Sequence, residues 1–323
     1  MKKKLKILKG ILVCVIISII SFYISTKINI SFMLLAVLIG ILSSKIYLKT
    51  EFKSGIDFSS NFVLKTGVSL LGFRFSYDSF LEIGLSPILI IIVLIICTFL
   101  AGILLAKLFK KEICFGILSG GAVAICGASA AIALSSVLSL TKKNQNFTST
   151  VIIGVTVLST FSMIFYPFIF GNLLRNELAL GFLFGTTIHD IAGVVGAGYT
   201  ISDEVGFYST FFKMIRVAFL PFLLLIVTFI FKRNKNNVFY LPKFLILFFC
   251  FAILRNLYDF SDQIIYMINN LCIFLLLVSI SSVGLKTDFS ILKRMNSIYF
   301  LILFIETLLI LFFSFIFSTF YNF

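Results

Sequence analysis

Long apolar stretches recur along almost the whole chain, separated by short segments that carry charged residues. A helix that crosses the hydrocarbon core of a bilayer needs about 20 predominantly apolar residues. With this requirement, the pattern predicts about eleven transmembrane helices, at roughly 8–26, 29–47, 58–76, 85–108, 113–140, 149–171, 178–201, 208–231, 239–258, 263–285 and 297–320. We therefore expect an all-α polytopic membrane protein in which residues 1–323 form a single integral membrane domain.

One segment, 119–136, interrupts this pattern, because 14 of its 18 residues are Gly, Ala, Ser or Cys. Small residues allow helix backbones to approach closely, and glycines also make a helix easy to unwind. A broken helix is tolerated at membrane depth only inside protein or against a water-filled cavity, where its free N–H groups can bind an anion. We predict a helix break at Gly120–Gly121 and in the region Cys126–Ser129, which includes Gly127. A tightly packed helix crossing is the alternative.

A second glycine-rich segment, Gly181–Gly198, resembles the first. Residues 116–120, which lead into the first segment, and residues 181–185 of the second both read Gly-x-Leu-x-Gly, and the second segment also holds His189, the only histidine in the chain, beside Asp190. Two glycine-rich segments with polar centres, in an otherwise apolar chain, are typical of a transporter binding site. We expect the two segments to face each other.

The composition excludes an ordinary soluble domain. The chain is 60% hydrophobic and 12% charged, whereas soluble proteins average about 25% charged residues. The net charge of +14 does not require a nucleic-acid partner, because most basic residues lie in short loops. The six cysteines lie in or beside apolar spans without a CxxC pair, so we expect no metal site and no disulfide framework. No cofactor is expected.

The distribution of Lys and Arg indicates an orientation. With a cytoplasmic N-terminus, eighteen basic residues fall at inner ends of spans, and only Lys27, Lys142 and Lys143 fall in outer loops. This split supports eleven crossings. Lys142 and Lys143 fit least well, and a re-entrant hairpin at 113–140 would place them inside and reverse the later topology. The motifs 72–77 and 284–289 share one order of residue classes and indicate an inverted repeat.

Few charged or titratable side chains lie inside the spans: Lys65, His189, Asp190, Lys213, Arg216, Arg255 and Glu306. Each Asp, Lys or Arg costs roughly 2.5–3.5 kcal/mol to insert, so each needs a partner or a water-filled cavity. Lys213 and Arg216 share one helix face because they are three residues apart. One interpretation is an anion site, with Arg216 as the cationic ligand and His189 as a titrating group. The other is a structural ion pair, and we predict that Asp190 pairs with Lys213 or Arg216.

Glu306 leaves two interpretations open. It stands beside Thr307 in a span that is otherwise apolar. A structural pair with Arg255 or Lys65 and a part in ion coupling are both compatible with its position.

Three sequence blocks resemble one known family. SGGAVAICGASAAIALSSVL at 119–138, GTTIHDIAGVVGAG at 185–198 and KMIRVAFLPF at 213–222 are similar to signature blocks of the YeiH-type family of proposed sulfate exporters. The resemblance implies a bacterial inner-membrane secondary transporter with inverted five-helix repeats and crossed, broken helices. Such a fold is known from the distantly related bile-acid sodium symporters and sodium/proton antiporters. Asp190 and Gly193 depart from the family pattern, which leaves the substrate and the coupling ion open.

We therefore expect a secondary transporter of a small anion, sulfate or a sulfonate, that works by alternating access and is coupled to H⁺ or Na⁺. The expected substrate-binding residues are Gly120, Gly121, Cys126, Gly127, Ser129, His189, Asp190, Lys213 and Arg216. A membrane-embedded scaffold or partner subunit is one alternative, and an enzyme with Cys126 or Ser129 as nucleophile and His189 as base is another. The absence of G-x-S-x-G and HExxH motifs counts against the enzyme. The lipid bilayer is the expected surrounding, the bacterial plasma membrane the expected location, and a homodimer one option for the oligomeric state.

Overall fold

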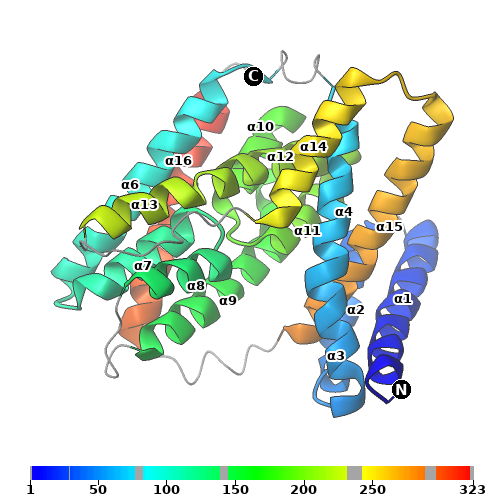
Figure 1. Cartoon of the computed structure of the whole chain (residues 1–323), viewed down its shortest axis with the longest axis horizontal. Helices are drawn as coiled ribbons and strands as arrows, with labels where there is room; N and C mark the ends of the chain where they lie inside the picture. The colour runs from blue at the N-terminus through cyan, green and yellow to red at the C-terminus, as the bar shows by residue number, and fades with distance from the viewer. Residues whose placement is uncertain are drawn as a thin grey trace. The chain divides into compact units, whose positions relative to one another are not determined.

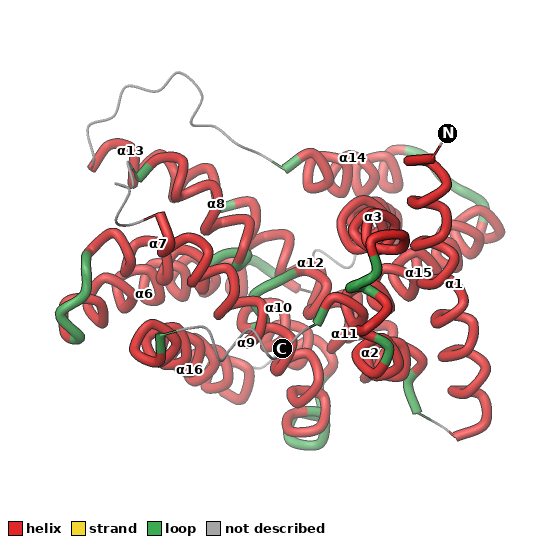
Figure 2. Tube along the Cα trace, turned by 90° about the horizontal axis from the view of Figure 1, so that it is seen from below, coloured by secondary structure: helices red, strands yellow, loops and turns green. Residues whose placement is uncertain are grey.

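The computed structural model describes residues 2–28, 30–76, 83–138, 145–230, 242–287 and 296–320. Every regular element within these ranges is helical (Figures 1 and 2). The helices are α1 (Lys2–Ile28), α2 (Phe32–Leu42), α3 (Thr50–Phe58), α4 (Leu64–Leu70), α6 (Ser86–Leu108), α7 (Ile113–Ala124), α8 (Ala128–Val137), α9 (Gln145–Phe170), α10 (Glu177–Thr187), α11 (Ile191–Ile201), α12 (Asp203–Ala218), α13 (Leu220–Ile230), α14 (Lys243–Leu257), α15 (Asp262–Lys286) and α16 (Ser297–Phe320). The prediction of an all-α polytopic membrane protein is confirmed.

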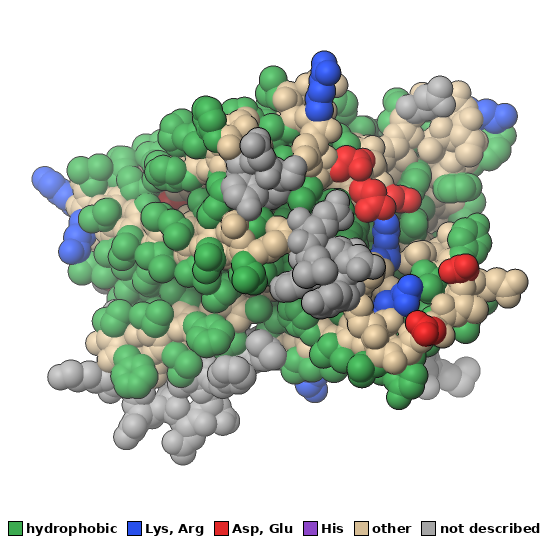
Figure 3. All heavy atoms as spheres, turned by 90° about the horizontal axis from the view of Figure 1, so that it is seen from above, with side chains coloured by type: hydrophobic (Ala, Val, Ile, Leu, Met, Phe, Trp, Pro, Cys, Tyr) green, Lys and Arg blue, Asp and Glu red, His purple; other side chains and the backbone are tan. Residues whose placement is uncertain are grey.

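Six helical stretches of the described residues are long and apolar enough to cross a membrane. They are Lys6–Ile28, Ser86–Leu108, Asn146–Phe170, Asp203–Ile230, Asp262–Lys286 and Ser297–Phe320. Figure 3 shows a face of the molecule on which hydrophobic side chains predominate, and its charged side chains lie in small groups. The long helices themselves expose large apolar side chains, among them Leu12, Leu89, Phe222 and Phe312, and exposed apolar surface of this kind is suited to contact with lipid.

Several predicted spans contain an irregularity. The span at 58–76 runs through a π-helical stretch, Ser59–Val63, and ends in the 3₁₀ turn Leu71–Arg74. The span at 208–231 is divided into α12 and α13 at Phe219. Pro221 accounts for this division, because proline has no N–H to continue the helical hydrogen bonds. The spans at 113–140 and 178–201 are broken near their centres, as described below.

Some sequence features used above lie outside the described residues. They include the ends of the repeated motif, Tyr77 and Phe289, and several basic loop residues: Lys142, Lys143, Lys232, Arg233, Lys235, Lys293 and Arg294.

The chain divides into two compact units. The first consists of Met1–Glu82, Val195–Phe207 and Lys243–Asp288, and the second consists of Ile83–Val194, Tyr208–Pro242 and Phe289–Phe323. All nine residues predicted to bind substrate belong to the second unit.

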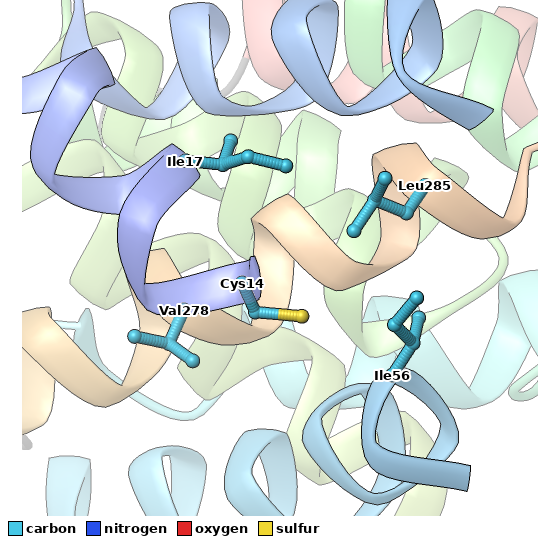
Figure 4. Packing of buried hydrophobic residues seen from close by; sticks show 5 residues of the cluster. All are labelled: Cys14, Ile17, Ile56, Val278 and Leu285. Carbon is cyan, nitrogen blue, oxygen red and sulfur yellow. The ribbon is translucent and has the colours of Figure 1, made fainter. Parts of the chain in front are cut away.

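The first unit is held together by close helix crossings. Its buried apolar cluster takes Cys14 and Ile17 from α1, Ile56 from α3, and Val278 and Leu285 from α15 (Figure 4). Beside this cluster α1 crosses α3 where two glycines meet: a Cβ atom added to Gly55 would lie 2.6 Å from the Cα atom of Gly10. A second glycine pair joins α2 to α15, since a Cβ atom on Gly40 would lie 2.9 Å from the Cα atom of Gly284. Small residues therefore set the helix separations here.

We expect Gly55→Ala to destabilise the protein strongly. The added methyl group would overlap the main chain of α1, and main-chain atoms cannot move away without separating the two helices. Gly67→Ala is the matched control, because its methyl group would meet only the side chains of Leu275 and Leu276. Thermal unfolding in detergent should show a much larger fall in melting temperature for Gly55→Ala. Equal melting temperatures for the two variants would contradict this account of the crossing.

Polar contacts gather in and beside the segment 44–60 of this unit. The Lys286 ammonium lies 2.9 Å from Asp57 Oδ1, and the Tyr47 hydroxyl donates to the same oxygen at 3.1 Å. Burial and the adjacent Asp57 carboxylate raise the pKa of Tyr47 to about 12. Lys9 Nζ lies 3.0 Å from Glu51 Oε2, and this contact lowers the pKa of Glu51. These contacts lie in and beside the connection between the predicted spans at 29–47 and 58–76, where the structure forms α3.

Candidate functional site

The first glycine-rich span is broken between α7 and α8. The three residues between the helices are Ile125, Cys126 and Gly127, and Gly127 has φ +62° and ψ −119°. Residues with a Cβ atom avoid this conformation, so glycine permits the break here. The prediction of a break in the region Cys126–Ser129 agrees with this geometry. Ser129 lies in the first turn of α8.

The predicted break at Gly120–Gly121 is wrong, because both residues lie inside α7. A Cβ atom on Gly102 of α6 would lie 2.5 Å from the Cα atom of Gly120, so Gly120 serves a close crossing of α6 and α7. This is the alternative that the small-residue pattern left open. Gly120 and Gly121 are fully covered by protein, and neither lies at the break.

The helices α7 and α8 fold back on each other. Gly121 lies near the end of α7 and Leu134 lies in the second half of α8, yet a Cβ atom on Gly121 would overlap the Leu134 side chain. Two helices that continued in one direction would keep these residues far apart, since each residue adds about 1.5 Å. Figure 1 shows α8 alongside α7. The geometry favours the re-entrant hairpin over a full crossing at 113–140.

The second glycine-rich span is broken between α10 and α11. Ile188, His189 and Asp190 separate the two helices. Asp190 starts α11, because its Oδ1 atom accepts a hydrogen bond from the main-chain N–H of Gly193 at 2.5 Å. The two breaks meet: a Cβ atom on Gly127 would lie 3.4 Å from the Cβ atom of His189. The predicted facing of the two segments is therefore present at the breaks.

Two basic side chains of α12 bind the main chain at these breaks. Lys213 Nζ donates to the carbonyl oxygens of Ile125, at 2.9 Å, and Ile188, at 2.6 Å. Lys213 thus connects the first break to the second. Both Lys213 and Arg216 are at most 1% exposed.

Arg216 binds the ends of the same two helices. Its Nε and Nη2 atoms donate to the carbonyl oxygens of Ala124, at 3.0 Å, and Val123, at 2.6 Å, both at the end of α7. Its Nη1 atom donates to the Gly185 carbonyl oxygen of α10 at 3.2 Å. The last carbonyl groups of a helix lack helical partners and carry its partial negative charge. The two cations supply both the missing donors and the compensating charge.

The predicted ion pair of Asp190 with Lys213 or Arg216 is wrong. Within the part of the chain that the structure describes, no nitrogen of either cation lies within 4.0 Å of the Asp190 carboxylate. Asp190 remains near enough to interact electrostatically with Lys213. The carbonyl groups freed by the two breaks take the place of the carboxylate, because they present several partial negative charges at hydrogen-bonding distance.

His189 is fully buried and bound to α16. Its Nε2 atom lies 2.9 Å from the hydroxyl oxygen of Thr307, and that hydroxyl donates to the Leu303 carbonyl oxygen at 2.7 Å. Because the Thr307 proton is already committed, we assign the ring proton to Nε2, which donates to Thr307. Nδ1 then carries a lone pair, and no described residue donates to it.

Helix α16 contributes to the site, although none of its residues is among the nine predicted to bind substrate. Besides Thr307 it carries Glu306, whose Oε1 atom lies within hydrogen-bonding distance, 2.7 Å, of the Ser119 hydroxyl oxygen of α7. Adjacent residues of α16 thus bind both glycine-rich spans. The available signal was a pair of adjacent polar residues in an apolar span.

The start of α8 carries the most accessible polar group at the breaks. Ser129 is exposed, and its hydroxyl lies 2.7 Å from the buried thiol of Cys126. The first N–H groups of a helix have no acceptor within that helix. Hydroxyl and N–H donors of this kind suit an anion. The described residues contain no group of three or more His, Cys, Asp or Glu side chains that could hold a metal ion.

The structure brings seven of the nine predicted residues to the two breaks: Cys126, Gly127, Ser129, His189, Asp190, Lys213 and Arg216. It separates their roles. Lys213, Arg216 and His189 are bound inside the protein, whereas Ser129 is exposed and Asp190 is half-buried.

Comparison with known proteins gives one consistent result. The model of a family described as conserved hypothetical protein 698 matches residues 9–318. An UPF0324 membrane protein of Chlorobaculum tepidum is 33% identical over 287 residues, which cover 86% of this chain and 80% of the relative. The UPF0324 membrane protein TauZ of Paracoccus denitrificans is 34% identical over 271 residues, which cover 81% of this chain and 79% of TauZ. The similarity spans both compact units and both breaks.

Proposed function

Because the chain belongs to the UPF0324 family of membrane proteins, the YeiH-type family that its sequence blocks resemble, we propose that it is a secondary transporter of a small anion. The proposed substrates are oxyanions such as sulfate or a sulfonate. Residues 1–323 act as one ion-coupled transporter domain that alternates access between the two sides of the bilayer. We place it in the bacterial plasma membrane with its N-terminus in the cytoplasm, in accord with the basic residues that precede the hairpin at 113–140, whose assignment the hairpin does not change.

The observation that carries this proposal is the charge at the meeting point of the two breaks. Lys213 and Arg216 supply two positive charges, and Asp190 supplies one negative charge. The C-terminal ends of α7 and α10 add about half a negative charge each, and the N-terminal ends of α8 and α11 add about half a positive charge each. The balance is about one positive charge, which suits an anionic ligand.

In this proposal the buried cations and the exposed donors have different roles. Arg216 uses three of its donors on main-chain carbonyl groups, so it orders the breaks and provides the positive field. The N–H groups at the start of α8 and the Ser129 hydroxyl contact the anion. This assignment modifies the sequence-based expectation that Arg216 binds the anion directly.

The proposal is tested by uptake of radiolabelled sulfate and of a radiolabelled sulfonate into proteoliposomes of the purified protein. Uptake is measured without a gradient, with a pH gradient and with a Na⁺ gradient. Accumulation above that in protein-free liposomes supports transport. A lack of accumulation of either anion under all three conditions would overturn the proposal.

Ser129→Ala is expected to raise the KM for the transported anion about tenfold or more, since a hydrogen bond to a charged group contributes about 1.5–3 kcal/mol. Ser135→Ala is the matched control, because Ser135 lies on the same helix and its hydroxyl donates to the Ile132 carbonyl oxygen. Saturation curves of initial uptake rates give both values. An unchanged KM for Ser129→Ala would remove this hydroxyl from the site.

A further inference from the structure

Glu306 is a buried acid that the proposed anion site does not use. Its side chain is fully buried in the second unit, and its Oε1 atom lies 2.7 Å from the Ser119 hydroxyl oxygen. Among the described residues, none donates to its Oε2 atom, and no Lys, Arg or His nitrogen lies within 4.0 Å of the carboxyl group. Lys65 and Arg255 belong to the first unit, so the alternative of a pair with one of them stays a prediction, and among the described residues of the second unit the carboxyl group has no cationic partner. A buried carboxylate without a cation is very costly, so this carboxyl group is neutral and holds a proton.

The hydrogen bonds around Ser119 agree with a bound proton. The Ser119 hydroxyl lies within hydrogen-bonding distance of two oxygens, Glu306 Oε1 and the Gly116 carbonyl at 3.3 Å. A hydroxyl has only one proton to donate. If Glu306 carries a proton on Oε1, it donates to Ser119, and Ser119 donates to Gly116. The added proton satisfies both contacts.

The helices packed on α16 do not provide a charged partner within the described residues. They are α6, α7, α9 and α10. Their titratable groups are Cys97 and Lys107 of α6, Cys114 of α7, Tyr166 of α9 and Glu177 of α10. His189, in the break that follows α10, contacts Thr307. Lys107 and Glu177 lie in the terminal turns of their helices. Glu306 is thus free to take up or release a proton without breaking an ion pair.

A sodium ion would lack its usual ligands at the breaks. Transporters with broken helices coordinate Na⁺ with unwound carbonyl groups and helix C-terminal ends. Here Lys213 and Arg216 bind five such carbonyl oxygens, those of Val123, Ala124, Ile125, Gly185 and Ile188. The Lys213 and Arg216 side chains therefore use the carbonyl oxygens that a sodium ion would need as ligands.

We propose that the coupling ion is a proton and that Glu306 is the group that carries it. In the state described here the Glu306 carboxyl group is protonated and is hydrogen-bonded to the Ser119 hydroxyl. Exposure to water on the other side of the membrane releases the proton to water as hydronium and leaves a carboxylate, which is protonated again when it returns. The contacts of Glu306 with α7 and of Thr307 with His189 connect this cycle to both breaks. The inference rests on the proposed anion transport and names its coupling ion.

Infrared spectroscopy tests the bound proton without any transport. The purified wild-type protein at neutral pH should show the C=O stretch of a protonated carboxyl group, and the band should shift in D₂O. Glu306→Gln should lose this band, and Glu51→Gln, at an exposed carboxylate, should keep it. Ser119→Ala, which removes the hydroxyl partner, should shift its frequency. A band that persists unchanged in Glu306→Gln and in Ser119→Ala would overturn the assignment.

Transport tests the coupling. The ratio of anion uptake with a pH gradient to uptake without one should exceed one for wild type and Glu51→Gln, and should fall to about one for Glu306→Gln. A Na⁺ gradient should have no effect. A pH response retained by Glu306→Gln, or a response to Na⁺, would overturn the coupling role. If wild type moves no anion at all, the proposed function fails, and the infrared result still decides whether Glu306 holds a proton.

Discussion

Arg216→Ala is expected to abolish anion transport and to lower the thermal stability of the protein. Three buried carbonyl groups, those of Val123, Ala124 and Gly185, would lose their donor. Each buried polar group left without a partner costs about 1–3 kcal/mol. The variant also removes a positive charge from the meeting point of the breaks. The protein should still insert, because the span at 208–231 becomes more apolar.

Arg216→Lys is the matched variant for this result. It keeps the charge, but a lysine ammonium cannot reproduce the planar, forked geometry of guanidinium. We expect partial recovery of melting temperature and of uptake relative to Arg216→Ala, below wild type in both. Uptake at the wild-type rate by Arg216→Ala in proteoliposomes, with its amount in the membrane verified, would exclude Arg216 from the mechanism.

Gly127→Ala is expected to have the second-largest effect. With φ at +62° and ψ at −119°, an alanine here is strained at a cost of about 1–3 kcal/mol. The added methyl group would also lie 3.3 Å from Val155 and 3.4 Å from the Cβ atom of His189, where the two breaks meet. A change of 1–3 kcal/mol corresponds to a change of about 5- to 150-fold in an equilibrium constant, so we expect a loss of anion affinity in this range.

Gly121→Ala is its control within the same hairpin. Gly121 lies inside α7, and its added methyl group would overlap the end of the Leu134 side chain and touch that of Leu223, which can both move more readily than the main chain. Saturation kinetics of uptake and thermal unfolding of both variants make the comparison. A smaller effect of Gly127→Ala than of Gly121→Ala would show that the positive φ angle does not shape the site.

The site illustrates which contacts are readable from residue types. The sequence singled out Lys213, Arg216 and Asp190 because charged residues are rare in apolar spans. We predicted an ion pair between Asp190 and one of these cations, because charged side chains are the only charges that can be read from a sequence. The carbonyl groups that bind Lys213 and Arg216 belong to Val123, Ala124, Ile125, Gly185 and Ile188, residues without polar side chains. Their negative character arises only where a helix ends.

The sequence by itself determined the class of protein and one break, in the first glycine-rich segment. Repeated apolar runs of about 20 residues match the thickness of the hydrocarbon core of a membrane. A helix forms all its main-chain hydrogen bonds within the same segment, so such runs cross the membrane as helices. The first glycine-rich segment predicted the break in the region Cys126–Ser129, because glycine alone adopts the conformation of Gly127 without strain. These properties depend on local composition, and a linear pattern records them.

Only the tertiary structure decided which glycines break a helix and which pack it, and which partners the buried polar groups have. Gly120 lies inside α7 at its close crossing with α6, although its neighbours in sequence resemble those of Gly127. Glu306 meets Ser119 across 187 residues, and His189 meets Thr307 across 118 residues. Such contacts depend on how helices that are distant in the sequence pack against each other. The physical reason is that a buried polar group needs a hydrogen-bond partner. The sequence shows which polar groups are buried in apolar spans, but only the packing determines which partner each one has.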